Sequence, residues 1–134
     1  MTIFLDANTV ISILRKNVNM RVIDNLKMYP KNRVKVPSMV KAELIAGALI
    51  SDNQKANLRN TEKTLSFFQI VPFDDAAAEM YGKIKARLEK SGNMIGPNDL
   101  IIAATVLSRG GTLVTSNTKE FSRVEGLDLV DWFV

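Results

Sequence analysis

The chain has 134 residues, a net charge of +4, and neither histidine nor cysteine. These absences exclude a histidine base, a Ser-His-Asp triad, a thiolate nucleophile, disulfide bonds and zinc sites built from thiolates. Any catalysis must therefore rest on carboxylates, hydroxyls, amides, lysine or arginine, a set that suits a hard metal ion bound by oxygen atoms.

The positive charge is concentrated near the amino terminus. Residues 1–41 carry a net charge of +6, and residues 42–134 carry −2. Clustered lysine and arginine favour a polyanionic partner such as nucleic acid, although a solubilising surface has the same composition. The longest apolar run, at 100–107, is too short to span a membrane, and the amino-terminal segment lacks a secretory pattern. We therefore expect a cytoplasmic protein with a single domain over residues 1–134.

Short apolar segments alternate with helical patterns along the whole chain. In chain order, the pattern predicts a strand at 2–5, helices at 10–14 and 20–27, a strand at 34–36, helices at 38–48 and 52–66, a strand at 68–71, helices at 74–90 and 97–109, and strands at 112–115 and 127–130. Asn8 or Thr9 is the expected N-cap of the first helix, and Ser38 that of the third. Strands that alternate with helices pair in parallel, so we predict a three-layer α/β/α sandwich around a central parallel sheet of four to five strands.

Two strand ends indicate where a ligand would bind. Asp6 follows the first predicted strand, and Thr115, Ser116 and Asn117 lie at the end of the fourth. Ligands of open parallel sheets bind beyond the carboxyl ends of the strands. We therefore expect these two segments to meet at one edge of the sheet.

Three acidic residues lie in apolar sequence surroundings. Asp6 follows the apolar segment 3–5, Glu43 has apolar or small residues one helical turn away on both sides, and Asp99 precedes the apolar run 100–104. Buried carboxylates that converge repel one another unless a divalent cation lies among them. Mg²⁺ or Mn²⁺ suits an all-oxygen site, and such an ion can activate water and stabilise a phosphoryl transition state.

Each of these acids also has a structural interpretation. Asp6 could cap the helix that follows it, and Asp99 lies near a helix start, where acidic residues are common. Glu43 lies in the middle of a helix on an apolar face, so capping does not explain it. Taken together, the three acids favour a metal site.

Four segments in register carry a family resemblance. They are FLDAN at 4–8, SMVKAELIAG at 38–47, IGPNDLIIA at 95–103, and LVTSNTKEF at 113–121 continued to Asp131 and Trp132. With these segments the chain resembles the PIN-domain ribonucleases and, within them, the VapC-like toxins of toxin–antitoxin pairs. The resemblance covers essentially the whole chain and implies a PIN-like form of the predicted sandwich.

Two positions depart from the family pattern. Asn117 stands where many relatives carry a fourth acid, and Val40 stands where a hydroxyl residue is frequent. Asn117 retains a carbonyl oxygen that can ligate a metal or order a water, and the nearby Glu120 can contribute negative charge.

The resemblance implies a metal-dependent endoribonuclease in which Asp6, Glu43 and Asp99 hold Mg²⁺ or Mn²⁺. Residues with auxiliary roles would be Asn8, Thr115, Ser116, Asn117 and Glu120. Contacts with the RNA backbone are expected from Arg15, Lys16 and Arg21, against the alternative of a solvated surface. The implied partners are a tRNA or mRNA substrate, a cognate antitoxin and a second copy in a homodimer, with a larger assembly on antitoxin binding and no membrane.

Two other functions are alternatives to an endoribonuclease. A non-catalytic PIN-like scaffold that binds RNA or protein is favoured by Asn117 and Val40, and disfavoured by the three retained acids. A phosphoaspartyl enzyme is disfavoured because its chemistry needs a second aspartate two residues after Asp6, where this chain has Asn8.

Overall fold

A computed structural model describes residues 1–15 and 19–134. Its sheet has five parallel strands in the order β3-β2-β1-β4-β5. The strands are β1 (Ile3–Leu5), β2 (Val34–Pro37), β3 (Gln69–Val71), β4 (Thr112–Val114) and β5 (Asp128–Val130). The described helices are α1 (Ala7–Leu14), α2 (Met20–Lys27), α3 (Ser38–Ile50), α4 (Gln54–Leu65), α5 (Asp75–Ser91), α6 (Pro97–Ser108) and α7 (Thr118–Phe121), with a 3-10 turn η1 (Lys31–Arg33). The predicted α/β sandwich with a parallel sheet is confirmed.

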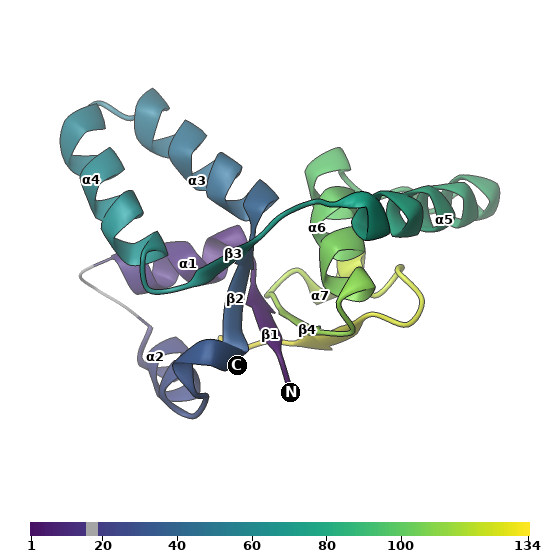
Figure 1. Cartoon of the computed structure of the whole chain (residues 1–134), viewed down its shortest axis with the longest axis horizontal. Helices are drawn as coiled ribbons and strands as arrows, with labels where there is room; N and C mark the ends of the chain where they lie inside the picture. The colour runs from purple at the N-terminus through teal and green to yellow at the C-terminus, as the bar shows by residue number, and fades with distance from the viewer. Residues whose placement is uncertain (16–18) are drawn as a thin grey trace.

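The central strand β1 is the most deeply buried part of the sheet. Ile3, Phe4 and Leu5 are at most 1% exposed, and β1 pairs with β2 on one side and β4 on the other. A parallel strand covered by helices on both faces is apolar throughout, which explains why this segment does not alternate. Figure 1 shows α1, α2 and α4 on one side of β1 and β2, and α5 and α6 on the other.

The first helix begins three residues earlier than predicted because Asp6 caps it. The Asp6 Oδ1 atom accepts a hydrogen bond from the Thr9 N–H at 2.9 Å, in place of a helical carbonyl. The prediction of Asn8 or Thr9 as the cap was therefore wrong. Ser38 as a cap was also wrong: the chain leaves β2 at Pro37 (φ −62°, ψ 144°) and Ser38 is already the first residue of α3.

The other predicted strands and helices are present, with ends shifted by a residue or two. The sequence pattern missed α7 and η1. Both are too short to show a helical period, so an apolar pattern cannot reveal them.

Helices α5 and α6 pack against each other. At one end, Arg109 after α6 forms an ion pair with Asp74 before α5, with Nη2 and Oδ2 2.9 Å apart. At the other end, residues 92–96 join the two helices, and Gly92 takes the left-handed conformation (φ 72°) that ends α5. The carboxyl end of α5 therefore lies beside the amino end of α6.

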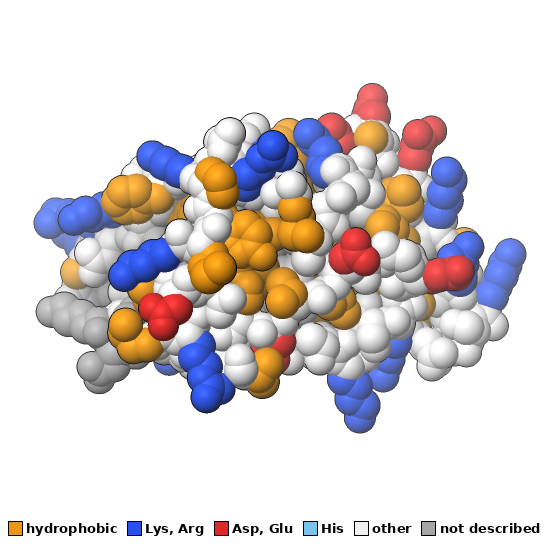
Figure 2. Space-filling model, turned by 90° about the horizontal axis from the view of Figure 1, so that it is seen from below, with side chains coloured by type: hydrophobic (Ala, Val, Ile, Leu, Met, Phe, Trp, Pro, Cys, Tyr) orange, Lys and Arg blue, Asp and Glu red, His pale blue; other side chains and the backbone are white. Residues whose placement is uncertain are grey.

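The underside of the molecule, where both termini lie in Figure 1, carries apolar side chains at its centre and basic ones toward its ends (Figure 2). Met1 and Val134, at the two termini, are 75% and 80% exposed. In the described part of the chain, no helix is both long and apolar enough to cross a bilayer.

Candidate active site

Asp6, Glu43 and Asp99 lie around one cavity of about 200 Å³, together with Asn8 and Asn117. They come from five different parts of the fold. Asp6 follows β1, Asn8 lies in α1, Glu43 in the middle of α3, Asp99 in the first turn of α6, and Asn117 in the loop after β4. The structure therefore places the three acids in one site at the carboxyl edge of the sheet. Their roles in metal binding and catalysis stay predictions.

Asp6 is held by both the sheet and the helix that follows it. Its N–H donates to the Val114 carbonyl of β4 at 3.2 Å, and its Oδ1 accepts the Thr9 N–H. The residue is only 6% exposed. The structural interpretation of Asp6 as a cap is correct. It does not exclude a second role, because the cap engages one of the two carboxylate oxygens.

The acids of the cavity disfavour one another's charged form. Burial raises the pKa of Asp99 to about 6, and the negative charges of Glu120, Glu43 and Asp6 add to this effect in that order. Burial also raises the pKa of Glu43, and the charge of Asp6 adds to it, while a hydrogen bond from the Asn98 side chain acts in the opposite direction. A cation among these groups would relieve the repulsion.

Asn117 and Glu120 form a hydrogen-bonded pair at the edge of the cavity. Asn117 Nδ2 donates to Glu120 Oε2 at 3.0 Å, and the Gly96 N–H donates to Glu120 Oε1 at 2.9 Å. These two hydrogen bonds lower the pKa of Glu120, in that order. The amide nitrogen of Asn117 is therefore engaged outside the cavity, and its carbonyl oxygen is the atom suited to a cation.

The remaining auxiliary residues differ in their positions. Thr115 is fully buried, and its Oγ1 accepts the Asn117 N–H at 3.0 Å, so it orders the loop that carries Asn117. Ser116 is exposed and is not among the described residues that line the cavity. Val40 is fully buried in the core, where a hydroxyl would need its own partner.

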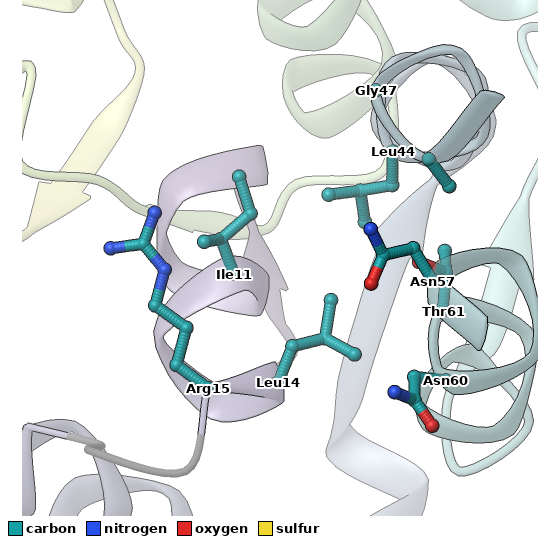
Figure 3. Close-up of a pocket in the computed structure, with 9 residues that line it drawn as sticks. Ile11, Leu14, Arg15, Leu44, Gly47, Asn57, Asn60 and Thr61 are labelled. Atoms are coloured by element: carbon teal, nitrogen blue, oxygen red, sulfur yellow. The ribbon is translucent and has the colours of Figure 1, made fainter. Parts of the chain in front are cut away.

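The basic residues predicted to contact RNA lie away from this cavity. Arg15 is exposed after the end of α1 and lines a separate groove of about 470 Å³ between α1, α3 and α4. In Figure 3, Leu14 projects from α1 toward α4, while the Arg15 side chain extends along α1 away from it. Arg21 is exposed in the first turn of α2, and Lys16 lies outside the described residues.

The donor set of the cavity fits a hard, hydrated divalent cation. Among the described residues, no three acidic side chains are arranged as ready-made ligands of a single ion. Mg²⁺ retains several waters and is usually bound through one or two carboxylates, so it does not require such a group. Carboxylates that raise one another's pKa in an all-oxygen cavity therefore suit Mg²⁺ or Mn²⁺, with water completing the coordination.

Sequence reasoning missed two contributors to the site, the Asn98 side chain and the Gly96 N–H. The Asn98 side chain of α6 forms a hydrogen bond with Glu43 of α3. The Gly96 N–H binds Glu120, which lies 24 residues later in the chain. Both positions belong to the segment that carries Asp99, but nothing in their local pattern indicates which partner they meet. Only the packing of α6 against α3 and α7 reveals it.

Comparisons with known proteins show the family of this chain. Residues 3–127 match the PIN domain family. Ribonuclease VapC2 of Rickettsia felis is 34% identical over 133 residues, which cover 98% of each chain. The tRNA(fMet)-specific endonuclease VapC of Shigella flexneri is 38% identical over 129 residues, which cover 96% of each.

Solved structures give the same result. The crystal structure of VapBC2 from Rickettsia felis, bound to a DNA fragment from its promoter, matches with a TM-score of 0.91 and 33% identity, covering 98% of this chain and 99% of that one. The DNA-bound VapBC structure from Salmonella typhimurium matches with a TM-score of 0.92 and 33% identity, covering 98% of each chain. The chain therefore belongs to the PIN-domain family and, within it, to the VapC ribonucleases of toxin–antitoxin pairs.

Proposed function

We propose that this protein is an Mg²⁺- or Mn²⁺-dependent endoribonuclease that hydrolyses RNA phosphodiester bonds as the toxin of a toxin–antitoxin pair. Membership of the VapC ribonucleases supports RNA cleavage and an antitoxin partner. The observation that carries the metal-dependent mechanism is the convergence of Asp6, Glu43 and Asp99, from three separate elements, on one small cavity.

In this mechanism the carboxylates of Asp6, Glu43 and Asp99 would hold the cation. A bound divalent ion supplies a nucleophilic water at neutral pH and positive charge opposite the scissile phosphate. Asp99 must be ionised to act as a ligand, and a cation favours that form despite the raised pKa. Thr115 holds the loop that places Asn117 at the cavity, and Asn8 supplies a neutral amide that can orient water or phosphate.

The partners in this proposal follow from the family. Solved relatives are complexes of VapC with VapB, so a cognate antitoxin is the expected protein partner. One relative is named as specific for tRNA(fMet), which makes tRNA the first substrate to test, with mRNA as the alternative. The cytoplasm as location, the homodimer and a larger assembly with the antitoxin remain parts of the proposal.

A non-catalytic RNA-binding scaffold is the alternative, and the neutral Asn117 favours it. Such a scaffold would have no use for carboxylates that destabilise one another. Asp99 and Glu43 both have raised pKa values in a cavity lined by acids. This arrangement costs folding stability, and a bound cation explains it.

The proposal can be tested with the purified protein on a mixed pool of tRNA and mRNA. We expect cleavage in Mg²⁺ or Mn²⁺ and none in chelator. Asp6→Asn should abolish cleavage while preserving the fold, because asparagine caps helices as well as aspartate does. Asp128→Asn, at an exposed acid on β5, is the matched control and should cleave like the wild type. Cleavage that persists in chelator or in Asp6→Asn would refute the mechanism.

A further inference from the structure

A row of basic side chains lies on the exposed surface of α5. Lys83, Arg87 and Lys90 follow one another at spacings of four and three residues, which places them on one face of the helix. All three are exposed, and together with Ala86 and Ser91 they line a broad, shallow hollow of about 540 Å³. No acidic side chain of the described residues lines this hollow.

Arg123 continues this row toward the acidic cavity. Its Nη1 donates to the Met94 carbonyl at 2.9 Å, two residues before Gly96, whose N–H is bound to Glu120. Arg123 also lines a second hollow, of about 130 Å³, together with Lys83 and Arg87 of α5. We call Lys83, Arg87, Lys90 and Arg123 the basic row.

The basic row runs away from the cavity along α5. Because residues 92–96 join α5 to α6, Lys90 lies near the amino end of α6, where Asp99 is, and Lys83 lies farther away. Seven residues separate Lys83 from Lys90, which is about 10 Å along the helix axis. A nucleic-acid strand leaving the cavity on this side would pass along the row.

Repulsion among the like charges of this row does not stabilise the fold. Like charges three and four residues apart on a helix repel each other, and the four side chains are exposed. Within the described residues that line the two hollows, Glu125 is the single acid, and it forms an ion pair with Arg87. Arg123 also lies close enough to Glu120 for its charge to lower the pKa of that carboxyl, so the four cations face Glu125 and Glu120 and the row keeps a net positive charge.

RNA cleavage in the acidic cavity would require positive charge nearby to bind the phosphates that flank the scissile bond. A cation in the cavity compensates the scissile phosphate, but the carboxylates repel the phosphates on either side of it. We propose that the basic row binds the phosphates of the RNA strand that flank the scissile bond on the α5 side. This inference rests on the proposed endoribonuclease function and names the surface that holds its substrate.

The alternative surface near the amino terminus is less suited to phosphates. Arg15 is the one charged residue of the described chain that lines the groove between α1, α3 and α4, and the rest of that groove is apolar or neutral. A backbone-tracking surface needs several cations in line, because each phosphate contact adds to the electrostatic term. The basic row has this arrangement.

The test compares two pairs of lysines. Lys83→Gln with Lys90→Gln removes two charges from the basic row, and Lys55→Gln with Lys63→Gln removes two exposed charges from α4. Binding of a single-stranded oligoribonucleotide is measured in chelator as a function of salt, and cleavage is measured separately in Mg²⁺. We expect the first pair to weaken binding about fivefold and to flatten the plot of log affinity against log salt by about 1.4, since each single-strand contact contributes about 0.7.

Removing the acid that pairs with Arg87 should have the opposite effect. Glu125→Gln frees Arg87 from its ion pair, so we expect RNA affinity to rise and the salt dependence to steepen. A purely structural role of these side chains would not produce a gain in affinity. All of the substituted residues are exposed, and thermal unfolding should be unchanged.

The outcomes separate this inference from the proposed function. If the wild type binds RNA and the Lys83/Lys90 pair changes neither affinity nor salt dependence, the basic row is not a phosphate-binding surface. An equal loss in the α4 pair would show a general charge effect and would also overturn the inference. If the row variants weaken binding but the wild type cleaves no RNA with Mg²⁺ or Mn²⁺, the proposed function fails and the binding surface stands.

Discussion

Asp74 and Asp99 lie at the starts of two helices that pack together, yet the fold explains only one of them. Asp74 caps α5, because its Oδ1 accepts the Ala77 N–H at 3.0 Å. Its Oδ2 lies 2.9 Å from Arg109 Nη2. Both carboxylate oxygens therefore have a partner within the fold. Asp74 is an acid that stabilises the helix it begins.

Asp99 has the opposite surroundings in the first turn of α6. Its neighbours are the carboxylates of Glu120, Glu43 and Asp6, and burial together with these charges raises its pKa to about 6. The positive end of a helix favours an acid there, but here it is outweighed. A bound cation would explain why an acid occupies a position where its charged form is disfavoured. The two helix starts thus contrast a structural acid with a candidate metal ligand.

The largest expected difference between the two positions is in catalysis. Asp99→Asn should lower the cleavage rate by about a thousandfold, because it removes a ligand and a charge from the cation site. Asp74→Asn should remain within about twofold of the wild type, since asparagine preserves the cap. Cleavage rates of both variants at saturating Mg²⁺ check this. Equal rates in the two variants would remove the distinction between the two acids.

A smaller difference between the two positions is expected in how much Mg²⁺ binding stabilises the folded protein. Mg²⁺ at ten times its dissociation constant should raise the free energy of unfolding of the wild type by about 1.4 kcal/mol. The gain should be unchanged in Asp74→Asn and absent in Asp99→Asn. Urea unfolding with and without Mg²⁺ measures it. A full gain in Asp99→Asn would place the ion elsewhere.

The smallest expected effects are on the free energy of unfolding of the metal-free protein. Substitution of Asp74 should lower this free energy, and substitution of Asp99 should raise it. Asp74→Ala should lower the free energy of unfolding by about 1 kcal/mol through loss of the cap. Asp99→Asn should raise it at pH 8 by about 1 kcal/mol, a value reduced for the partial exposure of the residue. Urea unfolding in chelator measures both changes.

The gain from Asp99→Asn should also depend on pH. The pKa of Asp99 is about 6 in the folded protein and 3.8 by its ordinary value, so the folded state binds more protons between these values. Its contribution to stability is fully present below about pH 3.8 and is lost as the pH rises through 6. The advantage of Asp99→Asn should therefore disappear at low pH. An advantage that is constant from pH 4 to 8 would contradict the raised pKa.

The basic row and the groove near Arg15 show what charge counting along the chain leaves open. Charge counting along the chain pointed to residues 1–41 as the basic, RNA-facing region. The structure shows Arg15 beside a groove whose other described lining residues are uncharged, whereas four cations from α5 and the segment after α7 lie together. Net charge over a segment does not reveal which side chains share a face.

The sequence predicted some residues of the acid site well and others poorly. Asp6, Glu43 and Asp99 were recognisable because each is a charged residue in an apolar setting. Glu120 could be named only as a nearby charge, although its effect on Asp99 exceeds those of Glu43 and Asp6. Its position depends on α7, a helix of four residues without a detectable period, and on the Gly96 N–H, 24 residues earlier in the chain.

The sequence by itself determined the alternation of strands and helices, the parallel sheet and the three acids that stand out from their surroundings. These features are local, since they depend on hydrophobic periodicity and on single residues that conflict with it. Tertiary structure decided that Asp6, Glu43 and Asp99 line one cavity. It also decided that the Asn117 amide is engaged by Glu120, and that the cations of α5 and Arg123 form one row. Each of these depends on which distant segments pack together, and no local pattern encodes that.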